Sequence, residues 1–241
     1  MRFYRFTVYL TAATAGAGAA PVIEARNVIG HDAVVGFPET VPSGDMKFKP
    51  WLLVENGCDP YPAVDASGNT RSAISSGGLN PSGGSSSQCD NSPGQVYARG
   101  AEYGSRFGIM YSWYMPKDSP STGLGHRHDW EGVVVWIDHP RTTANPQVLG
   151  VSTSGHGDWT TVTGSAMPLD GGARPKIRYF SAWPVNHQLG TTDKRGGEQP
   201  LVAWESLTGA ARDALQNTDF GSANVPFKDP NFMDNLKGAS F

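Results

Sequence analysis

The sequence has little charge, little cysteine and no long apolar run. Only 17% of its 241 residues are charged, the net charge is −3, and no cluster of lysine and arginine occurs. This excludes a protein that binds nucleic acid through its phosphates. Beyond the amino terminus no stretch approaches the ~20 apolar residues that span a bilayer, so any membrane contact must be peripheral. A G-x-S-x-G motif and a phosphate-binding loop ending in GK[ST] are also missing, which argues against serine hydrolases and P-loop enzymes.

Turn-forming residues, in contrast, are abundant. The 30 glycines and 18 prolines interrupt every apolar segment, which favours many short strands over long helices. We expect a mainly β fold, a single-domain β-sandwich with peripheral helices. Buried strands are predicted at 106–115, 129–138 and 147–154, weaker strands at 159–164 and 176–183, an amphipathic helix at 203–217, and either a short helix or a strand at 31–41.

The amino terminus has the pattern of a secretory signal. Arg2 and Arg5 precede a mostly uncharged stretch, and Ala17 and Ala19 form an A-x-A arrangement. We expect a signal peptide at 1–19 and one domain at 20–241, although a short helix or an unstructured terminus is the alternative. In an exported protein a Cys58–Cys89 disulfide is favoured over two free thiols, and the absence of a C-x-x-C unit argues against a metal site there.

The stretch GHRHDWE, residues 125–131, gathers the ionisable side chains. If a strand begins near His128, alternation sends Asp129 and Glu131 to one face, where two carboxylates repel each other unless a cation, a shared proton or water lies between them. A hairpin-like return would bring Asp118, in the preceding loop, beside the start of this strand, and His126 lies in the turn immediately before it. These four side chains form an oxygen-rich set suited to Mg²⁺ or Ca²⁺.

Other interpretations of the stretch remain open. Arg127 could neutralise the carboxylates in a purely structural ion pair, and a lone Asp or His at a strand end is more often solvated or capping than metal-bound. The order His126, His128, Glu131 approaches the metal motif of cupins but is one residue short. We expect His128 to point away from Asp129 and to play a structural part in the core.

The segment GIMYSWYMPKDSPSTGLGHRHDWE, residues 108–131, resembles the central region of the necrosis- and ethylene-inducing-peptide-like proteins. GHRHDWE matches that family's heptapeptide signature, and GCDPYPAVDASGNT, QVYAR and AWPVNHQLG are also similar to family segments. The two cysteines are similar to the family type with one disulfide. The resemblance implies a β-sandwich similar to actinoporin-like cytolysins, no enzymatic activity, and binding to the sugar of glycosylinositol phosphorylceramide, a sphingolipid of the plant plasma membrane.

The resemblance also implies roles for individual residues. The metal-site carboxylates fall on Asp118 and Glu131, with His126 and Asp129 holding waters around the cation. His187 matches another histidine of that shell and, with Trp183, a position that binds the lipid head group. Without the resemblance, an aromatic residue such as Trp183 after a strand would be predicted to pack inward.

Three hypotheses follow. The first is a secreted cytolysin that binds the sphingolipid through a divalent cation, damages the outer face of the plant membrane and triggers necrosis. The second is a metal-dependent enzyme acting on plant cell-wall polysaccharide, with the carboxylates as general acid and base. The third is a non-toxic immune elicitor of the same family, in which segment 108–131 is the ligand of a plant immune receptor.

Overall fold

The computed structural model describes residues 30–70, 78–121, 123–182 and 186–241. The predicted signal peptide at 1–19 lies outside the described residues, as does Trp183, so the domain boundary at residue 20 and the position of that tryptophan stay predictions. Within the described residues, no helix is long and apolar enough to cross a membrane.

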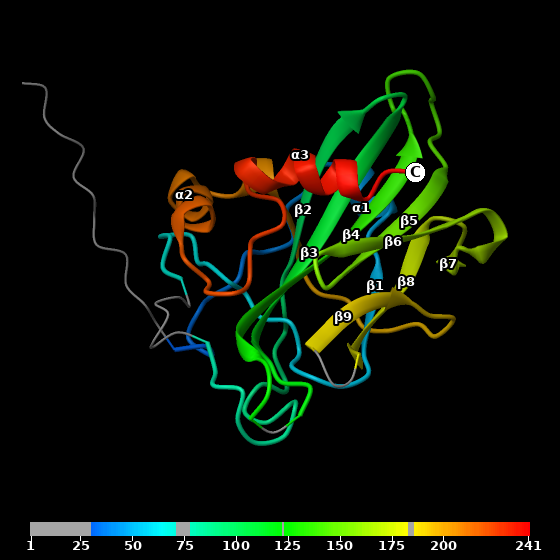
Figure 1. Cartoon of the computed structure of the whole chain (residues 1–241). Helices are drawn as coiled ribbons and strands as arrows, with labels where there is room; N and C mark the ends of the chain where they lie inside the picture. Colours follow the sequence, from blue (N-terminus) through cyan, green and yellow to red (C-terminus); the bar gives the residue numbers. More distant parts are fainter. Residues whose placement is uncertain (1–29, 71–77, 122, 183–185) are drawn as a thin grey trace, which may run out of the picture.

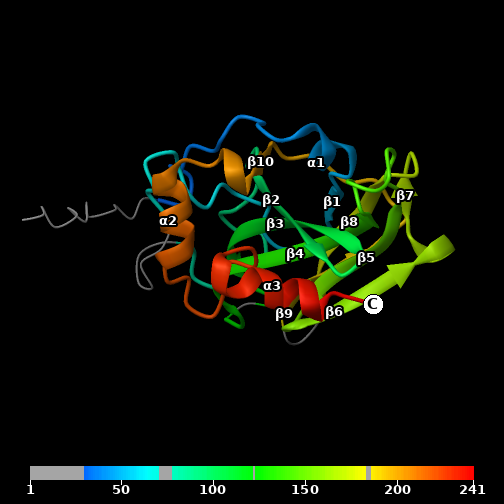
Figure 2. The same cartoon turned by 90° about the horizontal axis from the view of Figure 1, so that it is seen from above.

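Two β-sheets pack against each other and helices lie on the outside (Figures 1 and 2). This confirms the predicted mainly β sandwich. The larger sheet has the strand order β10-β2-β3-β4-β5-β6, and the smaller has the order β1-β8-β7 with β9 also paired to β8. The larger sheet contains β10 (Leu201–Ala203), β2 (Val96–Tyr103), β3 (Arg106–Asp118), β4 (His126–Asp138), β5 (Val148–Gly155) and β6 (Asp158–Thr163). The smaller contains β1 (Trp51–Val54), β7 (Leu169–Asp170), β8 (Arg174–Ala182) and β9 (Asn186–Thr191).

The β3–β4 hairpin is the centre of the larger sheet. Both strands are buried over almost their whole length, because apolar side chains stand on both of their faces. Trp113 on β3 and Trp136 on β4 are among the largest fully buried side chains. The strands predicted at 106–115, 129–138, 147–154, 159–164 and 176–183 therefore correspond to β3, β4, β5, β6 and β8.

Helix α3 (Asp229–Gly238), which no sequence pattern predicted, lies across the outer face of the larger sheet (Figure 1). Its buried residues are Phe232 and Leu236. Just beyond it, the carbonyl of Ala239 accepts hydrogen bonds from Trp136 Nε1 at 3.0 Å and Ser152 Oγ at 2.8 Å. These bonds fix the carboxyl end of the helix over β4 and β5.

The helix predicted at 203–217 is only partly present. Residues 201–203 form β10, which pairs in parallel with β2, Trp204–Ser206 form a 3₁₀ turn, and α2 spans Gly209–Asn217. The Thr208 hydroxyl caps α2 by accepting from the Ala211 N–H at 3.1 Å, which sets its start. The apolar side chains of this stretch are nevertheless buried, as expected for an amphipathic segment: Trp204, Leu207, Ala211 and Leu215.

The prediction for 31–41 was wrong. This stretch is a turn followed by irregular chain, with one bridge from Thr40 to Val202, and the next helix, α1, is the short segment Ser43–Lys47. The backbone N–H and C=O of Thr40 both form hydrogen bonds with β10 at the edge of the larger sheet, so these groups are paired without a helix or a full strand.

Cys58 and Cys89 form the predicted disulfide, with their Cα atoms 5.1 Å apart. The loop that it closes is tied to the β3–β4 hairpin by Lys117, which is 1% exposed and donates to the carbonyls of Ser82 at 3.2 Å and Gly84 at 3.0 Å. The Gly- and Ser-rich segment is therefore held by hydrogen bonds from Lys117, the residue that precedes Asp118.

Candidate functional site

The β3–β4 hairpin brings together the four site residues predicted around GHRHDWE. Asp118 and His126 are directly paired across the two strands, as are Met115 and Asp129. The predicted hairpin return is therefore correct, but Asp118 is the last residue of β3 rather than a loop residue, because the pairing continues through Lys117 and Arg127. His126 likewise begins β4 instead of lying in the turn.

Two unusual backbone conformations shape this end of the hairpin. Gly125 has a φ of +99°, and a Cβ atom added there would collide with the carbonyl oxygen of Asp118. Only glycine permits this close approach. His128 has a φ of +59°, and its Nδ1 lies 2.7 Å from the Tyr114 hydroxyl while its ring packs edge-on against Phe220. His128 therefore has the predicted structural position in the core.

Asp118 is fully buried and is held by His187 of β9. The backbone N–H of His187 donates to the carboxylate at 3.2 Å, and its Nδ1 lies 2.6 Å from Oδ1. His126 Nε2 is 3.6 Å from the other oxygen. The structure thus brings His187, far away in the sequence, to the predicted site, where its own Nε2 is buried and has no hydrogen-bond partner in the described chain.

Asp129 and Glu131 each accept a hydrogen bond from a residue outside the predicted site. Tyr179 of β8 donates its hydroxyl to Asp129 Oδ2 at 2.7 Å and stacks on His187 with ring centroids 4.8 Å apart. Ser154 of β5 donates a hydrogen bond to Glu131 Oε2. Both partners come from other strands, so no local motif signals them. The only indication in the sequence was that Tyr179 and Ser154 each lie in a predicted strand.

Burial and mutual repulsion disfavour the charged forms of both carboxylates. Burial, followed by the negative charge of Asp118, raises the pKa of Asp129 to about 7, although the Tyr179 hydrogen bond opposes this rise. Burial, followed by the charge of Asp129, raises the pKa of Glu131 well above its usual value. Each of these carboxyl groups thus favours either a proton or a nearby positive charge.

The described chain supplies no lysine or arginine to this cluster. In residues 30–70, 78–121, 123–182 and 186–241, the ion pairs of Asp118 are with His126 and His187 alone, and neither Asp129 nor Glu131 forms one. Arg127, the alternative neutralising group, instead donates to the Gly78 carbonyl at 3.4 Å. No three His, Cys, Asp or Glu side chains of the described part converge closely enough to hold a metal ion directly.

This donor set is compatible with a hard cation that keeps part of its water shell. Its oxygens come from carboxylates, and within the described residues no lysine or arginine forms an ion pair with them. The cupin-like arrangement is not formed, because His128 contacts Tyr114 and Phe220 in the core while His126 and Glu131 border the open side.

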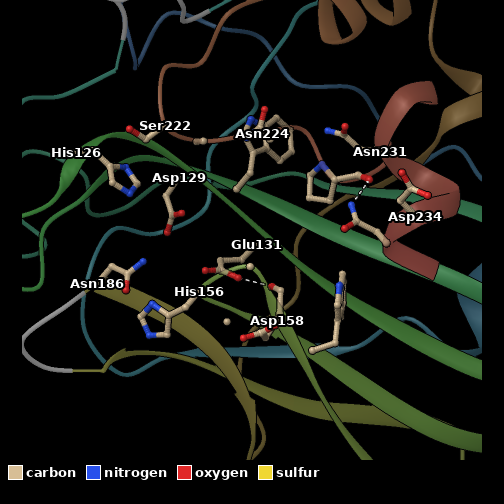
Figure 3. Close-up of a pocket in the computed structure, with 18 residues that line it drawn as sticks. His126, Asp129, Glu131, His156, Asp158, Asn186, Ser222, Asn224, Asn231 and Asp234 are labelled. Atoms are coloured by element: carbon tan, nitrogen blue, oxygen red, sulfur yellow. Dashed lines mark hydrogen bonds between the residues drawn. The ribbon is translucent and has the colours of Figure 1, made fainter. Parts of the chain in front are cut away.

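A pocket of about 670 Å³ opens beside the cluster (Figure 3). Its walls come from the start of β4, the β5–β6 turn, the start of β9, the turn at 222–226 and α3. His126, Asp129 and Glu131 line the pocket, whereas Asp118 and His187 lie behind them and are not among its lining residues. β4 forms a wall because its pairing with β5 begins only at Val133, which leaves the preceding residues at an open edge.

Comparison with known proteins gives consistent matches over nearly the whole chain. The sequence profile of the family described as Necrosis inducing protein (NPP1) matches residues 43–239. "Necrosis-inducing protein NPP1" of Phytophthora nicotianae is 48% identical over 240 residues, covering 96% of this chain and 98% of that protein.

Solved structures give the same match in three dimensions. "NLPPya in complex with mannosamine" is 50% identical with a TM-score of 0.81, covering 89% of this chain and 100% of that one. "Non-toxic HaNLP3 protein" is 42% identical with a TM-score of 0.80, covering 87% of this chain and 98% of that one. The toxin fold implied by the sequence resemblance is therefore confirmed.

Proposed function

The chain belongs to the necrosis-inducing protein (NPP1) family, a family of non-enzymatic effectors, and from this premise we propose that it is a secreted cytolysin that binds a sphingolipid head group. The target would be the terminal sugar of glycosylinositol phosphorylceramide at the outer face of the plant plasma membrane. Support comes from a relative's structure with bound mannosamine and from a polar pocket at the site end of the hairpin. Family membership decides against the alternative of a cell-wall polysaccharide enzyme.

A divalent cation, Mg²⁺ or Ca²⁺, would be held by Asp118 and Glu131, with His126, Asp129 and His187 around it. The observation that carries this proposal is a set of three buried carboxylates with no lysine or arginine ion pair in the described chain. When bound, the cation would supply positive charge that offsets their repulsion and a binding point for sugar hydroxyls. The chain's own part is to orient the oxygens, through the hydrogen bonds from His187, Tyr179 and Ser154.

Dye release from vesicles tests the proposal. Vesicles that contain the plant sphingolipid should leak when the protein is added, and vesicles of phosphatidylcholine and sterol alone should not. Chelation with EDTA should stop the leakage, and adding back Mg²⁺ or Ca²⁺ should restore it. Asp118→Ala and Glu131→Ala should abolish leakage, because each removes one of the two buried carboxylates that would hold the cation.

The matched control is Glu205→Ala, which removes an exposed carboxylate that does not line the pocket. This variant should leak like the parent protein, and far-ultraviolet circular dichroism should show that all three variants are folded. Full leakage by both Asp118→Ala and Glu131→Ala would refute the cation mechanism. Equal leakage from vesicles with and without the sphingolipid would refute the choice of target.

A second candidate function is that of a non-toxic elicitor, which the similarity to a protein named non-toxic HaNLP3 keeps open. Segment 108–131 would then act on a plant immune receptor. In the folded protein this segment is the central hairpin, buried from Gly108 to Ser119, so a receptor could read it only after unfolding or proteolysis. Heat-unfolded protein should therefore keep an elicitor response in leaves but lose all cytolysis.

A further inference from the structure

The turn that follows β1 contains the one asparagine of the sequence that precedes a glycine, Asn56. Asparagine before glycine is the pair most prone to deamidation, because glycine has no side chain to block attack of its backbone nitrogen on the asparagine amide. Asn56 is exposed, whereas Gly57 is buried beside the carboxylate cluster of Asp118, Asp129 and Glu131. A chemical change in this turn can therefore reach the candidate site.

We propose that Asn56–Gly57 is a modification site, at which spontaneous deamidation and conversion to isoaspartate disable the carboxylate cluster. The backbone nitrogen of Gly57 bonds to Cγ of Asn56, and the bond from Cγ to Nδ2 breaks. The Gly57 amide proton passes through solvent to the departing nitrogen, which leaves as ammonia. Water then opens the resulting succinimide ring at either carbonyl, which gives aspartate or isoaspartate. The modification does not depend on the proposed function, whereas its effect on leakage rests on it.

The attacking and leaving nitrogens are both without hydrogen bonds. Within the described residues, neither the backbone N–H of Gly57 nor Nδ2 of Asn56 donates to an acceptor. The Gly57 amide can therefore lose its proton without breaking a hydrogen bond, and ammonia can leave from an exposed side chain. Backbone N–H groups inside strands and helices lack this freedom, because they are already paired.

The side-chain carbonyl of Asn56 is also activated. The backbone N–H of Ser181 donates to Asn56 Oδ1 at 2.8 Å. Negative charge develops on this oxygen when the Gly57 nitrogen attacks, and a fixed backbone donor at such an oxygen stabilises the transition state. Asn91, which is also exposed and precedes Ser92, offers a comparison within the chain. Its side-chain oxygen accepts no hydrogen bond among the described residues.

The turn has little room for the change that isoaspartate makes. The chain is fixed on both sides of it, because the Glu55 N–H donates to the Tyr179 carbonyl at 2.9 Å and Cys58 forms the disulfide. Gly57 has a φ of +95°, and a Cβ added to it would stand 2.7 Å from Cε1 of Tyr179 and 2.9 Å from Nε2 of His187. Isoaspartate lengthens the main chain by a methylene group. Between fixed ends this displaces Gly57, and on the side of the two rings there is no free space.

These two rings orient the carboxylates. The His187 ring lies 2.6 Å from Asp118 Oδ1, the Tyr179 hydroxyl donates to Asp129, and the rings stack on each other. A shift of the stacked pair therefore moves two of the three buried carboxylates together. Aspartate, the other product, keeps the length of the main chain, and its carboxylate can still accept from the Ser181 N–H. We expect only the isoaspartyl product to disable the site.

Peptide mapping by mass spectrometry tests the modification. The folded protein is incubated at mildly alkaline pH, and isoaspartate at each asparagine is measured over time. We expect it to form at Asn56 at least about tenfold faster than at Asn91, the ratio that follows from a barrier about 1.4 kcal/mol lower. Asn56→Gln should remove the signal, because the longer side chain does not close the same ring. Isoaspartate that forms at Asn56 no faster than at Asn91 would overturn the proposal.

Dye release from the sphingolipid vesicles tests the consequence. Leakage should fall in proportion to the isoaspartate at Asn56, and treatment with protein isoaspartyl methyltransferase, which converts isoaspartate to aspartate, should restore it. Asn56→Asp, which mimics the other product, should leak like the parent when fresh, and Asn56→Gln should keep its leakage during incubation. The matched control is Asn217→Gln, at an exposed asparagine of α2 that does not line the pocket. It should lose leakage at the rate of the parent.

The possible failures can be told apart. Leakage that persists after Asn56 has become isoaspartate would overturn the proposal, as would a decline in Asn56→Gln equal to that of the parent. If the fresh protein does not leak at all, the proposed function fails by itself. The NMR signals of the His187 ring then decide the inference: they should shift as isoaspartate forms, and unchanged signals would overturn it.

Discussion

Tyr179→Phe gives the sharpest test of the cation site, because it removes one hydrogen bond and leaves the aromatic ring in place. The Tyr179 hydroxyl donates to Asp129 Oδ2 at 2.7 Å, and its ring stacks on His187. Phenylalanine would keep the stacking and remove the donor. Asp129 would then lose the one hydrogen bond that opposes the rise of its pKa and would bind its proton more tightly.

The size of the effect follows from the burial of the pair. A hydrogen bond to a charged group contributes about 1.5–3 kcal/mol, and every 1.4 kcal/mol corresponds to roughly a tenfold change in an equilibrium constant. If a cation must displace the proton of Asp129, its affinity near pH 7 should fall by about 10- to 100-fold. Losses of this size are typical for residues that orient metal ligands.

Calorimetric titration with Mg²⁺ and Ca²⁺ measures this loss, and Tyr111→Phe is the matched control. Tyr111 is also fully buried and donates a hydrogen bond of 2.7 Å, but to the backbone carbonyl of Asp45, away from the pocket. Both variants should lose stability, whereas only Tyr179→Phe should lose cation affinity. The affinity difference should also shrink once the pH is high enough to ionise Asp129 in both proteins, because no proton then competes with the cation. Unchanged affinity in Tyr179→Phe would refute the assignment of Asp129 to the cation site.

Two further predictions concern local geometry and pH. Gly125→Ala should displace the Asp118 carbonyl and abolish leakage activity, because Gly125 has a φ of +99° and no room for a Cβ. The control is Gly123→Ala, where φ is also positive but nothing lies within 4 Å of the added Cβ. This variant should lose only the stability that its strained backbone costs and should keep leakage activity. Leakage by Gly125→Ala equal to that of Gly123→Ala would contradict this role. In EDTA, Asp129 should make the protein less stable as the pH rises from about 4 to about 7, because its folded pKa of about 7 lies above its ordinary value of 3.8 and the unfolded chain releases the proton first. A divalent cation should therefore raise the melting temperature more at pH 8 than at pH 5 in differential scanning fluorimetry, and an equal rise at both values would contradict a site built on Asp129.

Much of the fold could be predicted from local pattern. The alternation and β-propensity of residues 106–115 and 129–138 indicated two strands with both faces covered, and these are the buried β3 and β4. Helix α2 was placed too early because the apolar spacing of Trp204 and Leu207 continues that of the helix. Their backbone is instead held by the 3₁₀ turn after β10, which no local pattern announces. Helix α3 was missed because its apolar residues are few and its stability comes from packing on the sheet.

The sequence by itself determined the hairpin and its four clustered side chains, because a short turn forces neighbouring strands to place Asp118, His126, Asp129 and Glu131 together. The tertiary structure decided what surrounds them. Tyr179 and Ser154 reach the carboxylates from strands of different sheets, and α3 closes the far side of the pocket. Such contacts depend on how two sheets and a helix pack over long sequence separations, and this packing is set by the whole core rather than by any short stretch of residues.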